Sequence, residues 1–143
     1  MDSYLICWTK AQNAQESSYW EYSVDEPDLE YVFLSVLEEI ANRNEQGKVF
    51  VDINDKEGGT ILSIDFNRNK GPSAHVTQIQ WRTFLPEAKF KWWLEEFPNT
   101  LLPFLLKSIR QSIVSIMGHA EGISLHFYDK EDRQVAELHC FYN

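Results

Sequence analysis

The chain has few of the residues that build a disulfide framework, a zinc centre or a membrane anchor. Cys7 and Cys140 are its two cysteines, and they lie near opposite ends without CxxC spacing. Such cysteines predict reduced, buried thiols. No apolar run reaches membrane-spanning length, and no charged segment precedes an apolar leader. We therefore expect a cytoplasmic protein that binds no structural metal and does not enter a membrane.

The chain also lacks the short motifs that mark common enzyme classes. It contains no GxxxxGKS or GxxxxGKT, no GxGxxG, no HExxH and no GxSxG. These patterns form phosphate-binding loops, dinucleotide sites, zinc-protease sites and serine nucleophile turns. Their absence leaves no sequence evidence for a nucleotide or metal cofactor, and we expect none.

Basic residues are scarce in the first part of the chain. Residues 1–60 hold 13 acids and 4 bases, whereas residues 61–143 hold 9 of each, so the whole net charge of -9 comes from the N-terminal segment. A localised negative field repels nucleic-acid phosphates and attracts basic surfaces. The pattern predicts a basic protein partner and no nucleic acid, although acidity for solubility alone is the plainer explanation.

The segment YWEYSVDEPDLEY, residues 19–31, combines four aromatic residues with five acids and contains no Lys or Arg. Part of this composition has a local explanation. Asp25 and Pro27 suit the start of a helix, where carboxylates stabilise the positive end of the helix dipole. Trp20 and Glu21 precede that helix and are not explained by it, so they are candidates for a surface that a partner covers.

Hydrophobic periodicity predicts an α+β domain. Apolar residues at spacings of three and four indicate helices that begin near residues 25, 86 and 100, the second covering PEAKFKWWLEEF and the third ending at Met117. Alternating residues indicate strands at 4–9, 19–24, 75–83 and in two hairpins, KVFVDINDKEGGTILSIDF and ISLHFYDKEDRQVAELHCFY. We expect a single domain, 1–143, with an antiparallel sheet built from hairpins, about three helices packed on one face, and no internal repeat.

Both hairpins have a mutually consistent register. If Val51 faces Ile64, the neighbouring pairs on the same face are also apolar, and the same holds if Leu125 faces Leu138. A third strand, residues 75–83, can add to the first hairpin. The helix over 86–97 leaves Trp92 outside its apolar stripe.

Two pairs of polar residues are candidates for catalysis. Asp52 and Asp65 share the outer face of the first hairpin, where two carboxylates could act as acid and base. In the second hairpin His126 faces Glu137 and His139 faces Ser124, which could give a general base with its orienting partner. Polar residues on a solvated sheet face and a cross-strand polar pair explain both equally simply, and no nucleophile is placed by the sequence.

The amphipathic helix followed by the strand-GlyGly-strand hairpin FVDINDKEGGTILSIDF resembles immunity proteins of bacterial polymorphic-toxin and contact-dependent inhibition systems, over roughly residues 25–85. The resemblance implies a non-enzymatic inhibitor that binds a cognate toxin with a basic surface, commonly a nuclease. At protein interfaces aromatic side chains supply anchoring area and carboxylates attract a basic partner, and we choose the partner-binding residues on these two grounds. They are Trp20, Glu21, Asp25, Glu26, Asp52, Asp65 and, as an extra anchor, Trp92. A small hydrolase with an acidic or His/Glu site and a non-catalytic adaptor are the alternatives.

Overall fold

The computed structural model describes residues 2–11, 17–43, 47–70 and 73–143. They form eight strands and two helices. The strands are β1 (Asp2–Ala11), β2 (Ser17–Glu26), β3 (Gly47–Asn54), β4 (Thr60–Arg68), β5 (His75–Leu85), β6 (Lys89–Leu101), β7 (Gly122–Tyr128) and β8 (Gln134–Tyr142). The helices are α1 (Leu29–Asn42) and α2 (Leu102–Met117).

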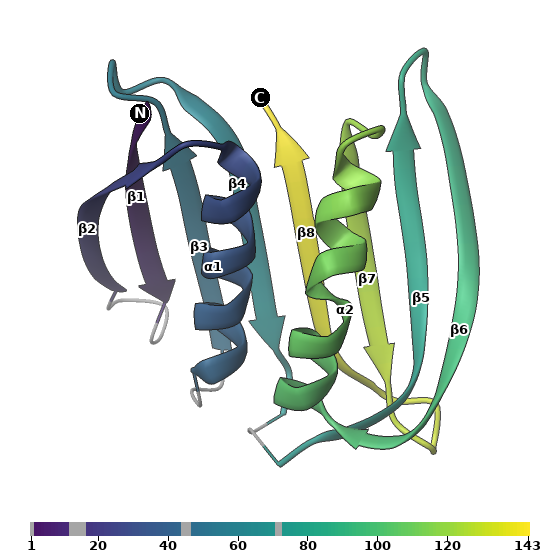
Figure 1. Ribbon diagram of the computed structural model, residues 1–143. Helices are drawn as coiled ribbons and strands as arrows, with labels where there is room; N and C mark the ends of the chain where they lie inside the picture. Colours follow the sequence, from purple (N-terminus) through teal and green to yellow (C-terminus); the bar gives the residue numbers. More distant parts are fainter. Residues whose placement is uncertain (1, 12–16, 44–46, 71–72) are drawn as a thin grey trace.

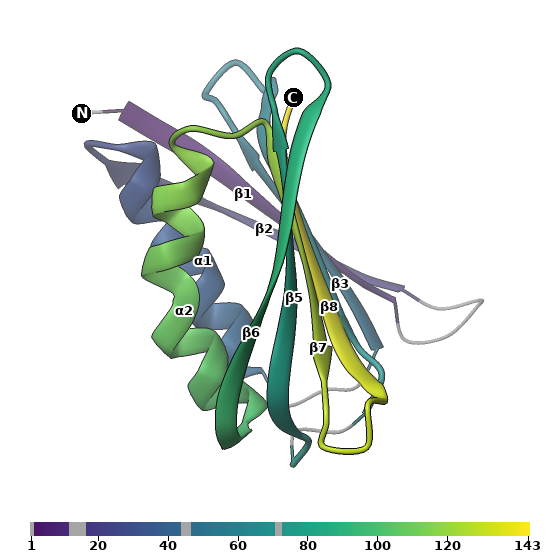
Figure 2. The ribbon, with the colours of Figure 1, turned by 90° about the vertical axis from the view of Figure 1, so that its right-hand side faces the viewer.

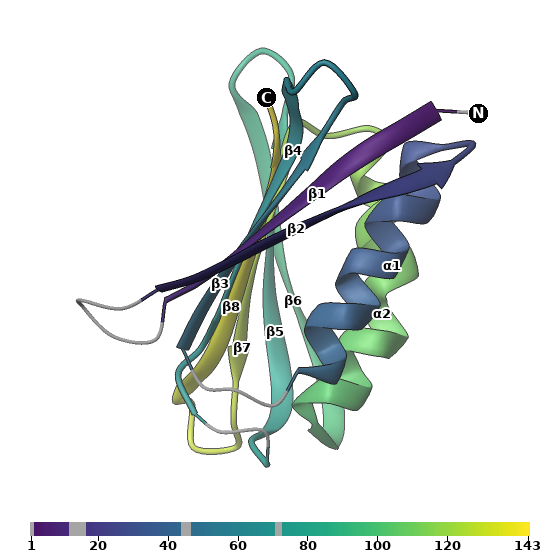
Figure 3. The ribbon, with the colours of Figure 1, turned by 90° about the vertical axis from the view of Figure 1, so that its left-hand side faces the viewer.

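All eight strands belong to one antiparallel sheet with the order β2-β1-β3-β4-β8-β7-β5-β6 (Figure 1). Both helices lie on the same face of this strongly twisted sheet, so the molecule has two layers (Figure 2). The opposite side view shows that this holds from β2 at one edge to β6 at the other (Figure 3). Neither helix in the described part of the chain combines the length and apolarity needed to cross a bilayer.

The prediction of about three helices is wrong, because the segment expected to form the second helix is strand β6. Trp81 pairs with Trp93 and Phe84 with Phe90 in an antiparallel ladder between β5 and β6. The stripe Phe90, Trp93, Leu94 and Phe97 fits helical spacing, but the segment is rich in aromatic residues, which suit a strand equally well. Adjacent Trp92 and Trp93 point to opposite faces of the sheet, as neighbours on a strand must.

The predicted start of the first helix also needs correction. Asp25 and Glu26 belong to β2, and Asp25 accepts a 2.5 Å hydrogen bond from Ser3. Helix α1 begins at Leu29 with Asp28 at its N-cap, and the Asp28 side chain makes no capping hydrogen bond. The helix ends at Asn42, before Gly47, which opens β3. The final helix matches its prediction, with Pro103 in the first turn and Gly118 at the C-cap.

The predicted registers of both hairpins are confirmed. Val51 pairs with Ile64 between β3 and β4, and Leu125 pairs with Leu138 between β7 and β8. The strand predicted at residues 75–83 is present, but its predicted neighbour is wrong, since β5 pairs with β6 and β7. Beside the first hairpin lie instead β1 and the C-terminal strand β8.

The structure contains an internal repeat that the sequence analysis did not find. Residues 2–68 and 75–142 each fold as strand, strand, helix, strand, strand, and the sheet order reads the same from each edge towards the centre. The halves meet where β4 pairs with β8. They are therefore related by an approximate two-fold axis that passes through the sheet between these strands.

Side chains at equivalent positions confirm the repeat. The same spacing separates Trp8 from Trp81 and Trp20 from Trp93. Trp8 stacks on Trp20 and Trp81 stacks on Trp93, each with ring centroids 5.6 Å apart. Each buried indole N-H donates at 3.1 Å to the side chain two residues after its stacking partner, the Tyr22 hydroxyl in one half and a Glu95 carboxylate in the other.

The turns of the two hairpins match as well. Asp55 and Asp129 each open the sequence Asp-Lys-Glu. Asp55 Oδ1 accepts hydrogen bonds from the backbone N-H groups of Glu57 and Gly59, and Asp129 Oδ1 accepts from those of Glu131 and Arg133. Asp side chains stabilise turns in this way by taking the place of a backbone acceptor.

A buried arginine fastens helix α1 to the sheet. Arg68 lies at the end of β4, is 2% exposed, and donates to the carbonyl oxygens of Ile40, Ala41 and Arg43. The last carbonyls of a helix have no partner within the helix and carry the negative end of its dipole. The guanidinium therefore satisfies both the hydrogen bonds and the charge of this helix end, and it also packs over the Phe66 ring.

We expect Arg68→Met to lower the free energy of unfolding by about 2–4 kcal/mol, because charge-assisted hydrogen bonds are lost and buried carbonyls are left without their donor. Urea denaturation measures the change. Arg110→Met is the matched control: Arg110 forms a partly exposed ion pair with Glu38, and its loss should change stability by no more than about 1 kcal/mol. Equal effects of the two substitutions would contradict the role given to Arg68.

Candidate functional site

The face of the sheet opposite the helices, which we call the open face, carries the candidate site. In the six inner strands the residues that alternate with the core residues point to this side, and the faces of β2 and β6 follow from their pairing with β1 and β5. Figure 2 shows both helices on the other side. Eight strands spaced about 4.8 Å apart make the sheet about 34 Å wide. No helix of the described residues lies over the open face.

Polar residues gather at the centre of the open face, around the approximate two-fold axis. Asp65 on β4 is the cross-strand partner of His139 on β8, which in turn faces Ser124 on β7. Ser124 Oγ lies 2.7 Å from His139 Nδ1. Asp52 flanks this row on β3, where its carboxylate accepts a 2.9 Å hydrogen bond from Ser63.

The predicted pairing of His126 with Glu137 is confirmed, and His139 joins them. Glu137 Oε2 lies 3.7 Å from His126 Nδ1 and 3.6 Å from His139 Nε2. The two imidazole rings meet edge to face with centroids 5.7 Å apart. His126 Nδ1 also donates at 2.9 Å to Gln134 Oε1. All three side chains are partly exposed, so solvent or a ligand can reach them.

Burial shifts the pKa of two groups in the central strands. The pKa of Asp65 is raised, chiefly because the carboxyl is partly buried, while the neighbouring His139 and Lys48 act in the opposite direction. The pKa of the Cys140 thiol is strongly raised by complete burial. Because a nucleophilic cysteine must ionise, Cys140 is a core residue. Cys7 is half-buried on the open face, and both cysteines are free.

Five of the seven predicted partner-binding residues lie on the open face, by the alternation of their strands. They are Glu21, Asp25, Asp52, Asp65 and Trp92. Trp20 lies on the helix side, stacked on Trp8 and covered by the Arg43 guanidinium 4.4 Å from its ring centre. Glu26 has the same orientation at the end of β2. The structure therefore brings Asp52 and Asp65 to the centre and separates Trp20 and Glu26 from the others.

An aromatic patch at the β6 edge was missed by the sequence analysis except for Trp92. Phe90, Trp92 and Leu94 are 55%, 57% and 52% exposed and follow one another along the open face of β6. Phe84 on β5 adjoins them, with its ring 6.3 Å from that of Phe90. Reading the segment as a strand would have found the patch, because alternate residues Phe90, Trp92 and Leu94 then share a face.

The comparisons with known proteins add no family. No protein-family model, curated protein or solved structure matches the chain.

The central polar residues suit binding better than nucleophilic catalysis. Ser124, His139 and Asp65 bring together the residue types of a hydrolytic triad, but Ser124 is only 5% exposed and bonds to Nδ1 of the imidazole. In triads the serine bonds to Nε2, and Nδ1 binds the carboxylate. Asp52 accepts its hydrogen bond from Ser63, a contact that orients the carboxylate on the sheet face. An ion or a polar surface can use these groups without such geometry.

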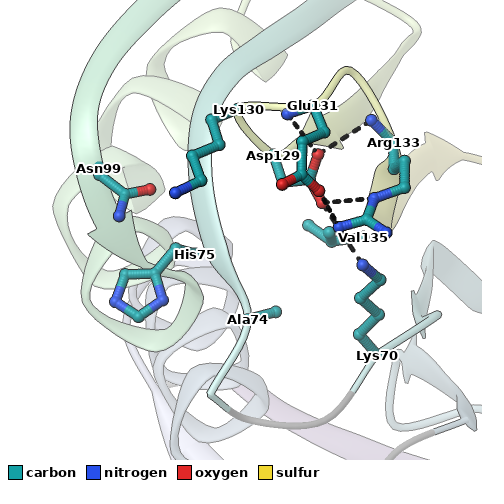
Figure 4. A pocket seen from close by; sticks show the side chains of 9 residues that line it. All are labelled: Lys70, Ala74, His75, Asn99, Asp129, Lys130, Glu131, Arg133 and Val135. Carbon is teal, nitrogen blue, oxygen red and sulfur yellow. Dashed lines mark hydrogen bonds and ion pairs between the residues drawn. The ribbon is translucent and has the colours of Figure 1, made fainter.

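A hollow lies at the turn of the second hairpin (Figure 4). It has a volume of about 210 Å³, and Lys70, His75, Asn99, Asp129 and Arg133 are among its lining residues. Lys70 and Arg133 converge on the carboxylate of Asp129, at 3.4 and 3.2 Å. The pKa of Asp129 is lowered to about 2. The largest cause is the hydrogen bond from the backbone N-H of Arg133, and the N-H of Glu131 and the two cations act in the same direction. These contacts give Asp129 a structural role, because they join the hairpin turn to the segment that follows β4.

Asp129 should make the stability of the protein depend on pH in the acid range. Its pKa is depressed in the folded protein, so its contribution to stability is complete above the ordinary value of 3.8 and is lost as the pH falls toward 2. We expect Asp129→Asn to lower stability at neutral pH and to make the decline between about pH 4 and pH 2 shallower, as followed by urea denaturation at a series of pH values. Asp55→Asn, at the equivalent turn, controls for the turn itself. A wild-type slope in Asp129→Asn would contradict the assignment.

Proposed function

We propose that this protein is a cytoplasmic immunity protein that binds a basic toxin protein through the open face of its sheet and neutralises it without catalysis. The observation that carries the proposal is the gathering of carboxylates and exposed aromatic side chains on the one face of the sheet that the helices leave uncovered.

Charge on the open face favours a basic partner. The carboxylates directed to it are Glu21, Asp25, Asp52, Asp65, Glu96 and Glu137, and the permanently cationic side chains are Lys48 and Arg82. Such an excess steers a basic protein toward the face and repels nucleic acid. A toxin that acts on nucleic acid needs a basic active site, so an acidic face can compete with its substrate.

The aromatic patch supplies anchoring area at the other end of the face. Large exposed apolar side chains in contact with one another mark interaction surfaces. Tryptophan is among the residues that contribute most to binding when a partner desolvates it. Carboxylates near β2 and β3 would orient the toxin, and the side chains of β6 would hold it.

The alternatives make different demands. A small hydrolase requires a reachable nucleophile, and the burial of Ser124, which is 5% exposed, favours binding. A non-catalytic adaptor could use the same face without protecting a cell.

Co-expression with the product of the adjacent reading frame distinguishes these functions. We expect that product to arrest growth alone, and this chain to restore growth and form a one-to-one complex. A harmless or non-binding neighbour would contradict the immunity function.

Charge reversal tests the acidic part of the face. We expect the double variant Glu21→Lys, Asp25→Lys to weaken binding to the toxin by about tenfold or more, mainly through slower association, and to reduce its salt dependence. Surface plasmon resonance at two ionic strengths measures both effects. The control Glu57→Lys, Glu121→Lys changes the net charge equally at exposed turn positions off the open face. Equal losses in the two variants would show that only net charge matters and would remove the open face from the proposal.

Trp92 tests the aromatic part. We expect Trp92→Ala to lower the free energy of binding by about 2 kcal/mol or more, since truncating a desolvated anchor has that effect. Stability should change by no more than about 0.5 kcal/mol, because the side chain is exposed. Phe104→Ala is the matched control: Phe104 is 63% exposed on α2, on the other side of the molecule. Calorimetric binding that is unchanged in Trp92→Ala would exclude the patch.

A further inference from the structure

We propose that His126, Glu137 and His139 form a binding site for one divalent transition-metal ion of the Zn²⁺ type on the open face. Among the described residues, these three side chains form a group of histidines and a carboxylate whose ligand atoms all lie within 4.8 Å of one another. The site lies on the face proposed to bind the toxin, but the observations that support it do not depend on that function.

Two of the three separations between ligand atoms are close to those of ligands on a common ion. Two ligands bound to tetrahedral zinc at about 2.0–2.1 Å stand about 3.3–3.4 Å from each other. Glu137 Oε2 lies 3.6 Å from one imidazole nitrogen and 3.7 Å from the other. Both separations are too long for hydrogen bonds, whose usual range ends near 3.2 Å. The carboxylate is thus placed between two imidazoles without being hydrogen-bonded to either, and small side-chain movements would bring all three onto one ion.

The strands hold these ligands in place. His126 and Glu137 are cross-strand partners, and Glu137 and His139 are two residues apart on β8, so all three share one face. Both strands lie inside the sheet, with β5 on one side and β4 on the other. Ligands on paired interior strands are positioned more rigidly than ligands on loops.

Outer contacts orient one imidazole for coordination. When His139 Nδ1 donates to Ser124 Oγ at 2.7 Å, the lone pair remains on Nε2, the nitrogen nearer to Glu137. Metal-binding histidines commonly donate their other N-H to a fixed acceptor in this way. His126 Nδ1 donates to Gln134 Oε1, and an ion at Nδ1 would replace that hydrogen bond.

The donor set selects the class of metal. Imidazole nitrogens with one carboxylate favour Zn²⁺ and related transition ions, whereas Mg²⁺ and Ca²⁺ prefer oxygen ligands. Three protein ligands leave a coordination position open, and the side chains are partly exposed. Water or a ligand from outside the chain can take that position.

The test uses the full chain without an affinity tag, stripped with a chelator and titrated with Zn²⁺ in a calorimeter. We expect one equivalent to bind, Mg²⁺ not to compete, and Co²⁺ in place of Zn²⁺ to give the strong visible absorption of a four-coordinate site. His126→Gln and His139→Gln should each weaken binding at least about tenfold, and Ser124→Ala by about tenfold through loss of orientation.

The matched control is the double variant His75→Gln, His119→Gln, which removes two exposed histidines away from the site and should bind as the wild type does. Circular dichroism checks that each variant folds. If a ligand variant does not fold, zinc-edge X-ray absorption of the wild type decides: nitrogen and oxygen ligands including two imidazoles support the site, and sulfur ligands overturn it. Binding that persists in His126→Gln and His139→Gln, or no binding by the wild type, also overturns it.

Discussion

The pairing of β4 with β8 is the interaction on which the rest of the structure depends. It joins the two halves of the chain, from Leu62 opposite Tyr142 to Arg68 opposite Ala136, and makes one sheet out of two four-stranded units. Because these strands are antiparallel, the two units are related by a rotation that keeps their helices on the same face. The helices then pack on one another, with Glu38 bound to Arg110 between them, and the other face stays uncovered.

The same pairing determines what lies at the centre of the open face. Asp65 meets His139 there, and these residues occupy equivalent positions in the two halves. Asp52 and His126 are also equivalent, since each lies between two core residues of the third strand of its half. The two units therefore share a backbone arrangement but differ in their chemistry: one presents carboxylates and the other imidazoles. This difference places the candidate cation ligands on the C-terminal side of the axis and most of the negative charge on the N-terminal side.

The sequence was sufficient where a local pattern decides the structure. Alternating apolar residues determined the registers of both hairpins and hence the cross-strand partners of His126 and His139, because a slip of one residue would expose the core. The sequence was not sufficient where two patterns fit one segment. Phe90, Trp93 and Leu94 satisfy helical spacing, but the segment forms a strand because it pairs with β5. The sequence was also not sufficient where the partner is distant in the chain. Nothing local to Asp65 indicates that His139 lies beside it, and Trp20 faces the core because Trp8 stacks on it.

The position of β8 has a consequence for how the chain acquires its structure. β8 is separated from β4 by more than 60 residues of chain, yet it lies between β4 and β7 at the centre of the sheet. Without β8, both neighbours would keep a bare row of backbone donors and acceptors, and the N-terminal unit would have no partner across the axis. Completion of the sheet therefore requires a long-range contact made by the strand that also carries Glu137 and His139.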